Sequence, residues 1–241
     1  MRSLSIIIPA YNEEQRLPAS LETVKTYLDT KSFDFVEVVV VDDGSRDQTA
    51  EIVRQTALKD ARFRLVSNPG NRGKGYAVRH GMQQAKGDWV LFSDADLSTP
   101  IHELDKLVAA VKREKADGAI GSRALDRSLV GKHQSFLREF AGRFFNVLMR
   151  LATGLPYRDT QCGFKMLRSD VARTVAARQQ SEGFGFDVEI LYLAKKHGFR
   201  VIEVPVRWFN ADGTKVSMWN GLAAFADPWR VRLNDLKGLY K

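Results

Sequence analysis

The first half of the chain alternates between short apolar runs and segments with helical spacing. Val36–Val41 is an almost unbroken β-branched run, and Trp89–Ser93 is another apolar run. Between Leu17 and Leu28, leucine and valine instead recur every three or four residues, as on one face of a helix. Runs that are apolar throughout are typical of strands covered on both faces. The alternation therefore predicts an α/β fold with a doubly wound, mainly parallel sheet flanked by helices.

The spacing also sets the expected order of elements. The strands predicted in this half are Leu4–Pro9, Val36–Val41, Phe63–Val66 and Trp89–Ser93, and the helices are Leu17–Leu28, Thr49–Leu58 and a segment ending near Ala85. The second half is less regular, with predicted helices at Leu104–Lys115, Phe136–Leu151, Val171–Ala177 and Val188–Lys196 and strands at Gly118–Arg123 and Val201–Trp208. Pro205 cannot donate to a neighbouring strand, so the last strand is expected at an edge. No repeat or linker divides the chain, so a single domain is expected.

Composition narrows the class of protein. The 241 residues are 44% hydrophobic and 27% charged, as in ordinary globular proteins. A single cysteine, Cys162, excludes an internal disulfide and fits a reducing compartment. No apolar run reaches the roughly 18 residues of a membrane span, and Leu4–Ala10 is too short for a signal peptide. A soluble or peripheral protein is therefore expected.

The formal net charge of +8 indicates which binding partners to expect. A basic surface suits nucleic acid, anionic lipid headgroups or phosphorylated substrates. The sequence has neither paired Cys/His zinc ligands nor the aromatic consensus of an RNA-binding sheet, so nucleic acid is not expected. Phosphorylated small molecules or lipids are the better hypothesis.

Two carboxylates follow the strand predicted at Trp89–Ser93. Asp94 and Asp96 are separated by the small Ala95, and alternation along a strand would point both acids to one side. Hard oxygen ligands of this kind suit Mg²⁺ or Mn²⁺, especially when a diphosphate completes the shell. Open α/β sheets bind ligands at the carboxyl ends of their strands. The motif therefore predicts a metal-bridged nucleotide-diphosphate site.

Two further acidic motifs follow other predicted strands. Tyr11 and Glu13 lie in the turn after Pro9, and Asp42 and Asp43 follow Val41. Each motif alone is explained as well by a turn or a helix cap. Because the carboxyl ends of parallel strands meet at one edge, the three together favour a binding site.

This arrangement resembles the inverting family-2 glycosyltransferases of the GT-A fold, and most closely those that transfer a sugar from a nucleotide diphosphate to polyprenyl or dolichyl phosphate. The resemblance spans about Ser3 to Ser217, and its strongest elements are Ile8–Glu13, Val41–Ser45, Asn71–Gly75, Asp94–Pro100, Gly121–Arg123 and Asp159–Lys165. It implies a GT-A domain over residues 1–217 and an amphipathic extension, 218–241, packed on it or at a membrane surface. Asp-Leu-Ser-Thr-Pro after Ala95 resembles the glucosyltransferase branch, whereas the mannosyltransferase branch usually has Gln at the position of Ser98. UDP-glucose is thus the expected donor, with GDP-mannose as the alternative.

The resemblance implies specific roles at the donor end. The residues implied to bind the base and ribose are Pro9, Tyr11, Glu13, Asp42 and Asp43, and Ala95 belongs to the same donor-binding set. Arg72 and Lys74, in a glycine-rich loop, would offset the charge of the nucleotide. Asp94 and Asp96 would hold Mg²⁺ or Mn²⁺ on the diphosphate, with Ser98 in the metal shell.

At the acceptor end, Arg123, Arg138 and Lys215 are the candidates for binding the lipid phosphate, because guanidinium groups match phosphate oxygens. Three residues, Asp159, Gln161 and Lys165, would contact the sugar or brace their own loop. Asp187 would act as base, orient the sugar or serve the structure. A lipid phosphate with a second pKa of about 6 is already anionic at neutral pH, so positioning and charge neutralisation should dominate catalysis.

The expected location is the cytoplasmic face of a membrane, held peripherally or through a membrane-protein partner. The apolar stripe of Phe136–Leu151 would lie in the lipid interface or pack on the sheet, and Trp219, Phe225 and Trp229 beside Arg230 and Arg232 form a second candidate patch.

Other classes fit the sequence less well. A sugar-nucleotide pyrophosphorylase would carry a basic glycine-rich loop after the first strand, and a dehydrogenase would carry Gly-x-Gly-x-x-Gly there. A family-2 enzyme with a non-lipid acceptor remains an alternative. A non-enzymatic basic protein with a degenerate nucleotide fold would not need Asp94 and Asp96.

Overall fold

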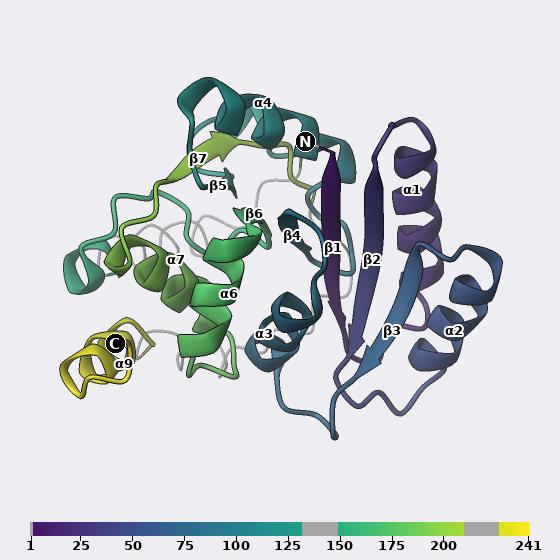
Figure 1. Cartoon of the computed structure of the whole chain (residues 1–241), viewed down its shortest axis with the longest axis horizontal. Helices are drawn as coiled ribbons and strands as arrows, with labels where there is room; N and C mark the ends of the chain where they lie inside the picture. Colours follow the sequence, from purple (N-terminus) through teal and green to yellow (C-terminus); the bar gives the residue numbers. More distant parts are fainter. Residues whose placement is uncertain (1, 132–148, 210–226) are drawn as a thin grey trace.

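A computed structural model describes residues 2–131, 149–209 and 227–241. Within these ranges seven strands form one sheet in the order β3-β2-β1-β4-β6-β5-β7 (Figure 1). The strands are β1 Ser3–Ala10, β2 Phe35–Asp42, β3 Phe63–Ser67, β4 Trp89–Ser93, β5 Gly118–Ser122, β6 Phe164–Arg168 and β7 Val201–Pro205. The helices are α1 Leu17–Asp29, α2 Thr49–Lys59, α3 Lys74–Gln84, η1 Ile101–Glu103, α4 Leu104–Glu114, η2 Arg127–Leu129, α6 Ser169–Arg178, α7 Phe186–Lys196 and α9 Asp227–Leu236.

The sheet separates two apolar layers, which explains why its central strands are apolar throughout. In β1, Ile7 joins the layer formed with α3, α6 and α7, whereas Ile6 and Ile8 join the layer formed with α1, α2 and α4. Strand β2 alternates in the same way, and residues 37–42 of it are all buried. The predicted α/β fold with helices on both faces is confirmed.

The sheet is mainly parallel, but β6 is an antiparallel strand that the sequence analysis missed. It lies between β4 and β5 and pairs antiparallel with both. The fully buried Lys165 interrupts the apolar run of β6. The pattern of apolar positions therefore did not predict a strand here, and the segment was placed in a loop motif. The other predicted strands are present, and β7 lies at the edge as Pro205 required.

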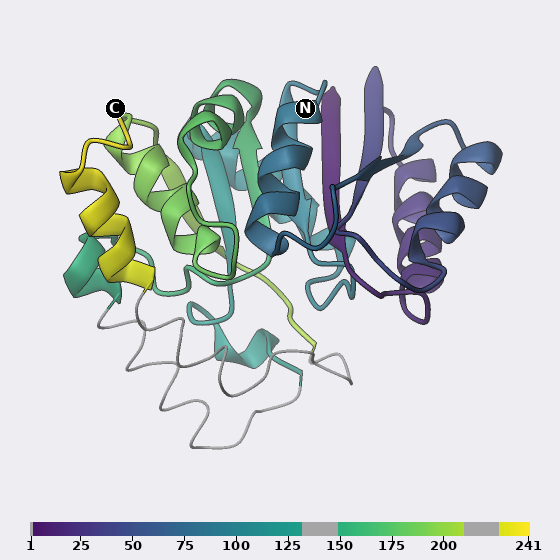
Figure 2. The same cartoon turned by 90° about the horizontal axis from the view of Figure 1, so that it is seen from below.

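The predicted helices are present where the structure describes them. Residues 136–148 of the expected helix Phe136–Leu151 lie outside the described ranges, and 149–153 are helical. In that turn Met149 is buried, while Leu151 of the predicted stripe is 77% exposed. Helix α9 lies on the outer side of α7 (Figure 2), and Tyr192 of α7 donates a 2.5 Å hydrogen bond to Asp235. In the described part of the chain no helix is long and apolar enough to cross a membrane.

Candidate active site

The three acidic motifs lie at one edge of the sheet, as predicted. Ala10 of β1 pairs with Asp42 of β2, and the Asp43 amide donates a 2.8 Å hydrogen bond to the Ala10 carbonyl. Strand β4 runs parallel to β1, so Asp94 emerges at the same edge. The site therefore rests on the ends of three adjacent strands.

Asp94 and Asp96 lie in a turn rather than in the strand itself. Strand β4 ends at Ser93, and the Leu97 amide donates to the Asp94 carbonyl at 3.1 Å. Leu97 has a φ of 48°, and the Ser98 amide donates to Asp96 Oδ1 at 2.9 Å. Both carboxylates therefore lie beyond the part of the chain in which strand alternation sets side-chain direction. The turn, which also buries Ala95 in the core, determines the direction of both carboxylates.

Asp94 forms an ion pair with Lys74 at the first turn of α3. The Lys74 Nζ and Asp94 Oδ1 atoms are 2.6 Å apart, and the ammonium lies 5.6 Å from the centre of the Phe92 ring. Burial disfavours the charged amine, but Asp94 and Asp187 outweigh it and raise the pKa of Lys74. A stable positive charge thus faces the candidate metal carboxylate.

A second, buried ion pair lies near the first. Lys165 of β6 contacts Asp187 in the first turn of α7 and donates a 2.6 Å hydrogen bond to the Cys162 carbonyl. Burial raises the pKa of Asp187 although Lys165 and Lys74 oppose it. The Lys165 side chain is only 2% exposed. Lys165 thus contacts both Asp187 and a carbonyl of its own loop, and its predicted role in contacting the sugar stays a prediction.

Arg123, one of the candidates for binding the acceptor phosphate, forms a third ion pair with Asp159. Asp159 accepts from Arg123 Nε at 2.7 Å, from Nη2 at 2.9 Å and from the Arg123 amide at 3.0 Å. Arg123 also lies 5.5 Å from the Trp208 ring. Asp159 is 3% exposed, and Arg123 outweighs burial and lowers the pKa of Asp159. Asp159 thus orients Arg123 instead of facing solvent, whereas Gln161 is exposed.

The glycine-rich loop is organised by Asp43. Its carboxylate accepts from the Arg72 amide at 3.0 Å, the Gly73 amide at 2.7 Å and Asn68 Nδ2 at 2.7 Å. The Arg72 guanidinium lies 4.6 Å from the Tyr76 ring. Asp43 therefore positions the loop. Its position next to Asp42 in the sequence did not predict this role.

The remaining donor candidates occupy the turn after β1. Glu13 accepts two hydrogen bonds of 2.8 Å from Arg16, and its amide donates to Thr49 at 2.7 Å. Tyr11 is 36% exposed at the sheet edge, and Pro9 pairs with Val41. Two of the predicted phosphate ligands, Arg138 and Lys215, lie outside the described residues, as do Trp219 and Phe225.

One site residue that sequence reasoning passed over is Gly163. A Cβ atom at this position would lie 2.1 Å from Asp94 Oδ2, and the Gly163 carbonyl accepts the Asp94 amide at 3.1 Å. Only a glycine leaves room for the Asp94 carboxylate here. The signal was present, because Gly163 stands inside the quoted motif Asp159–Lys165.

The side chains near Asp94 supply only part of the coordination shell of a hard divalent cation. Among the described residues, no group of three or more His, Cys, Asp or Glu side chains could hold a metal ion. Asp94 and Asp96 supply carboxylate oxygens, so the rest of the shell must come from water or ligand. This fits a cation that binds together with a diphosphate.

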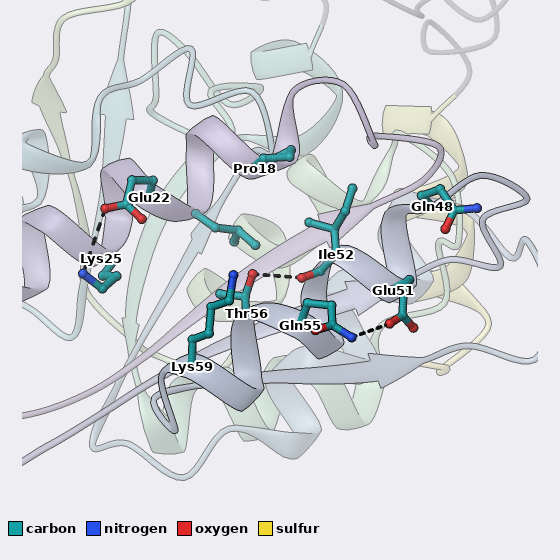
Figure 3. A pocket seen from close by; sticks show the side chains of 10 residues that line it. Pro18, Glu22, Lys25, Gln48, Glu51, Ile52, Gln55, Thr56 and Lys59 are labelled. Carbon is teal, nitrogen blue, oxygen red and sulfur yellow. Dashed lines mark hydrogen bonds and ion pairs between the residues drawn. The ribbon is translucent and has the colours of Figure 1, made fainter.

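A surface groove between α1 and α2 is distinct from this site (Figure 3). It encloses ≈ 320 Å³ and is lined by side chains such as Pro18, Lys25, Ile52 and Lys59. Two of its polar side chains bond to each other, since Gln55 donates to Glu51 at 2.7 Å. None of the predicted donor or acceptor residues lines it.

Comparison with known proteins identifies relatives over nearly the whole chain. The sequence model described as "Glycosyl transferase family 2" matches residues 5–176. The chain is 39% identical to the dolichyl-phosphate beta-glucosyltransferase of Drosophila melanogaster, over 99% of this chain and 77% of the relative. It is 34% identical to the enzyme of that name from Mus musculus, over 100% of this chain and 78% of the relative.

Solved structures share the fold. Glucosyl-3-phosphoglycerate synthase from Mycobacterium tuberculosis, in complex with Mn²⁺, UDP and phosphoglyceric acid, aligns with a TM-score of 0.70 and 18% identity, over 97% of this chain and 78% of that one. Its complex with Mg²⁺ and UDP aligns with a TM-score of 0.69 and 18% identity, over 97% of this chain and 79% of that one.

Proposed function

The chain belongs to the family 2 glycosyltransferases, and on this premise we propose that it transfers glucose from UDP-glucose to a polyprenyl or dolichyl phosphate with inversion. The observation that carries the choice of substrates is the similarity, at 39% and 34% identity over nearly the full chain, to enzymes named dolichyl-phosphate beta-glucosyltransferase. The alternative of a GDP-mannose donor has no comparable support.

At the donor end, Asp94 and Asp96 would hold Mg²⁺ or Mn²⁺, with Ser98 beside them. The cation would supply positive charge to the departing diphosphate. Lys74 would add a second positive charge, since its ammonium already lies 2.6 Å from Asp94. The turn with Pro9, Tyr11 and Glu13, together with Asp42, would face the base and ribose, and Asp43 would hold the loop of Arg72 in place.

At the acceptor end, an oxygen of the lipid phosphate would attack the anomeric carbon while the bond from that carbon to the diphosphate breaks. UDP leaves with the electron pair, and the anomeric configuration inverts. Arg123 would bind the acceptor phosphate, because Asp159 fixes its guanidinium through Nε and Nη2. Arg138 and Lys215 would assist, Asp187 would orient the sugar, and the exposed Gln161 would contact it. The acceptor is already anionic at neutral pH, so none of these groups has to remove a proton.

We also propose peripheral binding to the cytoplasmic face of a membrane, alone or with a membrane-protein partner. Helix α9 supports this, because Trp229, Leu233 and Leu236 are 58%, 53% and 79% exposed. At 100° per residue these three side chains span roughly 60° of the helix. Arg232 lies on one side of this stripe, and Arg230 and Lys237 lie on the other, all exposed. Aromatic and aliphatic side chains flanked by cations suit an anionic lipid interface.

Radiolabelled sugar transfer tests the reaction. UDP-glucose, UDP-galactose and GDP-mannose would each be supplied with polyprenyl phosphate, with Mn²⁺, with Mg²⁺ and with a chelator. Glucosyl lipid formed from UDP-glucose only when a divalent cation is present is the expected result. Mannosyl lipid from GDP-mannose would support the alternative, and transfer in the presence of chelator would exclude the metal role of Asp94 and Asp96.

A further inference from the structure

Glu189, two residues beyond Asp187 in α7, is a fully buried carboxylate. Its oxygens accept hydrogen bonds from the Gln180 amide at 3.0 Å and the Ser181 amide at 2.8 Å. The third donor is the hydroxyl of Tyr240, which follows α9. Glu189 thus joins the segment Gln180–Glu182 to the C-terminal part of the described chain.

The segment Gln180–Glu182 lies against the first turn of α3. The Glu182 carbonyl accepts the Tyr76 amide at 3.2 Å. A Cβ atom on Gly73 would lie 2.4 Å from the Glu182 carbonyl oxygen, and one on Gly75 would lie 2.5 Å from that of Ser181. Gly73, just before α3, and Gly75, in its first turn, therefore allow close contact between this segment and the start of the helix.

On its other side the segment borders a cavity of ≈ 400 Å³, lined by Ser181, Glu189, Asp227 and Arg230 among others. On this side Glu189 joins the segment to Tyr240 through the hydrogen bonds of its two oxygens. The Tyr240 ring is fully buried, lies 6.1 Å from the Tyr192 ring, and its hydroxyl accepts Asn234 Nδ2 at 3.2 Å. Because its ring is buried and its hydroxyl is hydrogen-bonded, Tyr240 is well placed to hold the Glu189 carboxylate.

We propose that Glu189 and Tyr240 are positioning residues for the donor site. They hold the segment Gln180–Glu182 on the first turn of α3 and so place Lys74 beside Asp94. This inference rests on the donor role proposed above for Lys74 and Asp94. It makes the C-terminal segment Asp227–Lys241 part of the support of the nucleotide site.

The test is Tyr240→Phe, which keeps the buried ring and removes the hydroxyl. A lost hydrogen bond to a charged group predicts a KM for UDP-glucose and a Kd for UDP with Mn²⁺ that rise about 5- to 10-fold, with kcat and the acceptor KM little changed. Hydrogen exchange of the Tyr76 amide should accelerate by a similar factor. Glu189→Gln, which replaces an acceptor oxygen with a donor, should produce larger changes of the same kind.

Tyr157→Phe is the matched control. Tyr157 is also buried, and its hydroxyl donates to the Val201 carbonyl at 3.1 Å, away from the segment Gln180–Glu182. The control should keep the wild-type Kd and the wild-type exchange at Tyr76. If Tyr240→Phe only lowers Tm, or changes both quantities no more than the control does, the inference is overturned. If the wild-type chain does not bind UDP with Mn²⁺, the proposed function fails instead.

Discussion

At the scale of single residues, the site contains three pairs of opposite charges. Lys74 pairs with Asp94, Lys165 with Asp187, and Arg123 with Asp159. Such pairs fix side chains before a ligand arrives, which lowers the cost of ordering them during binding. Under the proposed function, Lys74 and Arg123 lie at the edge where a diphosphate and a lipid phosphate would bring negative charge, whereas Lys165 is buried.

Gly163→Ala should inactivate the enzyme without unfolding it. The added Cβ would lie 2.1 Å from Asp94 Oδ2, so the carboxylate must move. A displacement of about 1 Å at a reacting group costs about 100-fold in rate, so we expect kcat/KM to fall by at least that factor. Gly183→Ala is the control, because a Cβ there meets nothing within 4 Å. Wild-type kcat/KM in Gly163→Ala would show that Asp94 needs no fixed position.

Asp159→Asn should remove an acid-dependent part of the stability. Arg123 lowers the folded pKa of Asp159, so the ion pair stabilises the fold above the ordinary pKa of about 3.9 and is lost as the pH falls through the folded value. We expect a loss of about 2–4 kcal/mol at pH 7 and a difference from wild type that narrows below about pH 4.

Tm measured between pH 3 and pH 7 checks this prediction. The control is Asp170→Asn, which removes an exposed ion pair with Arg168 and should cost less than about 1 kcal/mol. A stability loss in Asp159→Asn that stays constant down to pH 3 would contradict the role given to the pair.

At the scale of elements, the sequence predicted the regular half of the fold and missed what departs from regularity. Apolar runs and helical spacing were sufficient for β1 to β4 and their helices, because a strand buried on both faces leaves a plain signal. Strand β6 was missed because the buried Lys165 interrupts its apolar run. The partners of the charged residues were missed too, since Asp43 and the Arg72 amide, or Arg123 and Asp159, are brought together only by tertiary structure.

Helix α3 gives a prediction at this scale. Gly81 faces β1, and a Cβ atom on it would lie 2.4 Å from the Cγ2 atom of Ile7. In an exposed helix, alanine would be more stable than glycine by about 1 kcal/mol. Here overpacking should reverse the sign and destabilise Gly81→Ala by about 1–3 kcal/mol.

Urea unfolding measures this change. Exposed Gln83 on the same helix provides the control, since Gln83→Ala should be close to neutral. A Gly81→Ala variant more stable than wild type would mean that α3 can move away from β1.

At the scale of the whole molecule, the net charge of +8 is combined with an exposed apolar stripe on α9. If that stripe binds lipid, Leu236→Ser and Arg230→Glu should each weaken binding to phosphatidylserine vesicles. A basic residue near an anionic surface contributes about 1 kcal/mol, so charge reversal should cost about 10-fold or more. Raised salt should weaken wild-type binding in the same assay.

Two matched variants serve as controls for vesicle binding. Leu58 on α2 is 81% exposed against 79% for Leu236, and the side chains of Arg113 on α4 and Arg230 are both 73% exposed. Figure 1 shows α2 and α4 away from α9. Leu58→Ser and Arg113→Glu should therefore bind like wild type. Equal losses in both pairs would indicate general charge and hydrophobicity rather than a defined membrane face.

The antiparallel strand β6 has a consequence for the order in which the molecule is assembled. Strands β1 to β4 can pair from the first 93 residues, but β4 then remains an open edge, and the carbonyl that receives the Asp94 amide belongs to Gly163. Closing that contact joins positions 69 residues apart, and contacts of long sequence separation form slowly. Nucleotide binding during refolding should therefore appear only after the parallel half has formed, so that the last strand to enter the centre of the sheet is the one that completes the site.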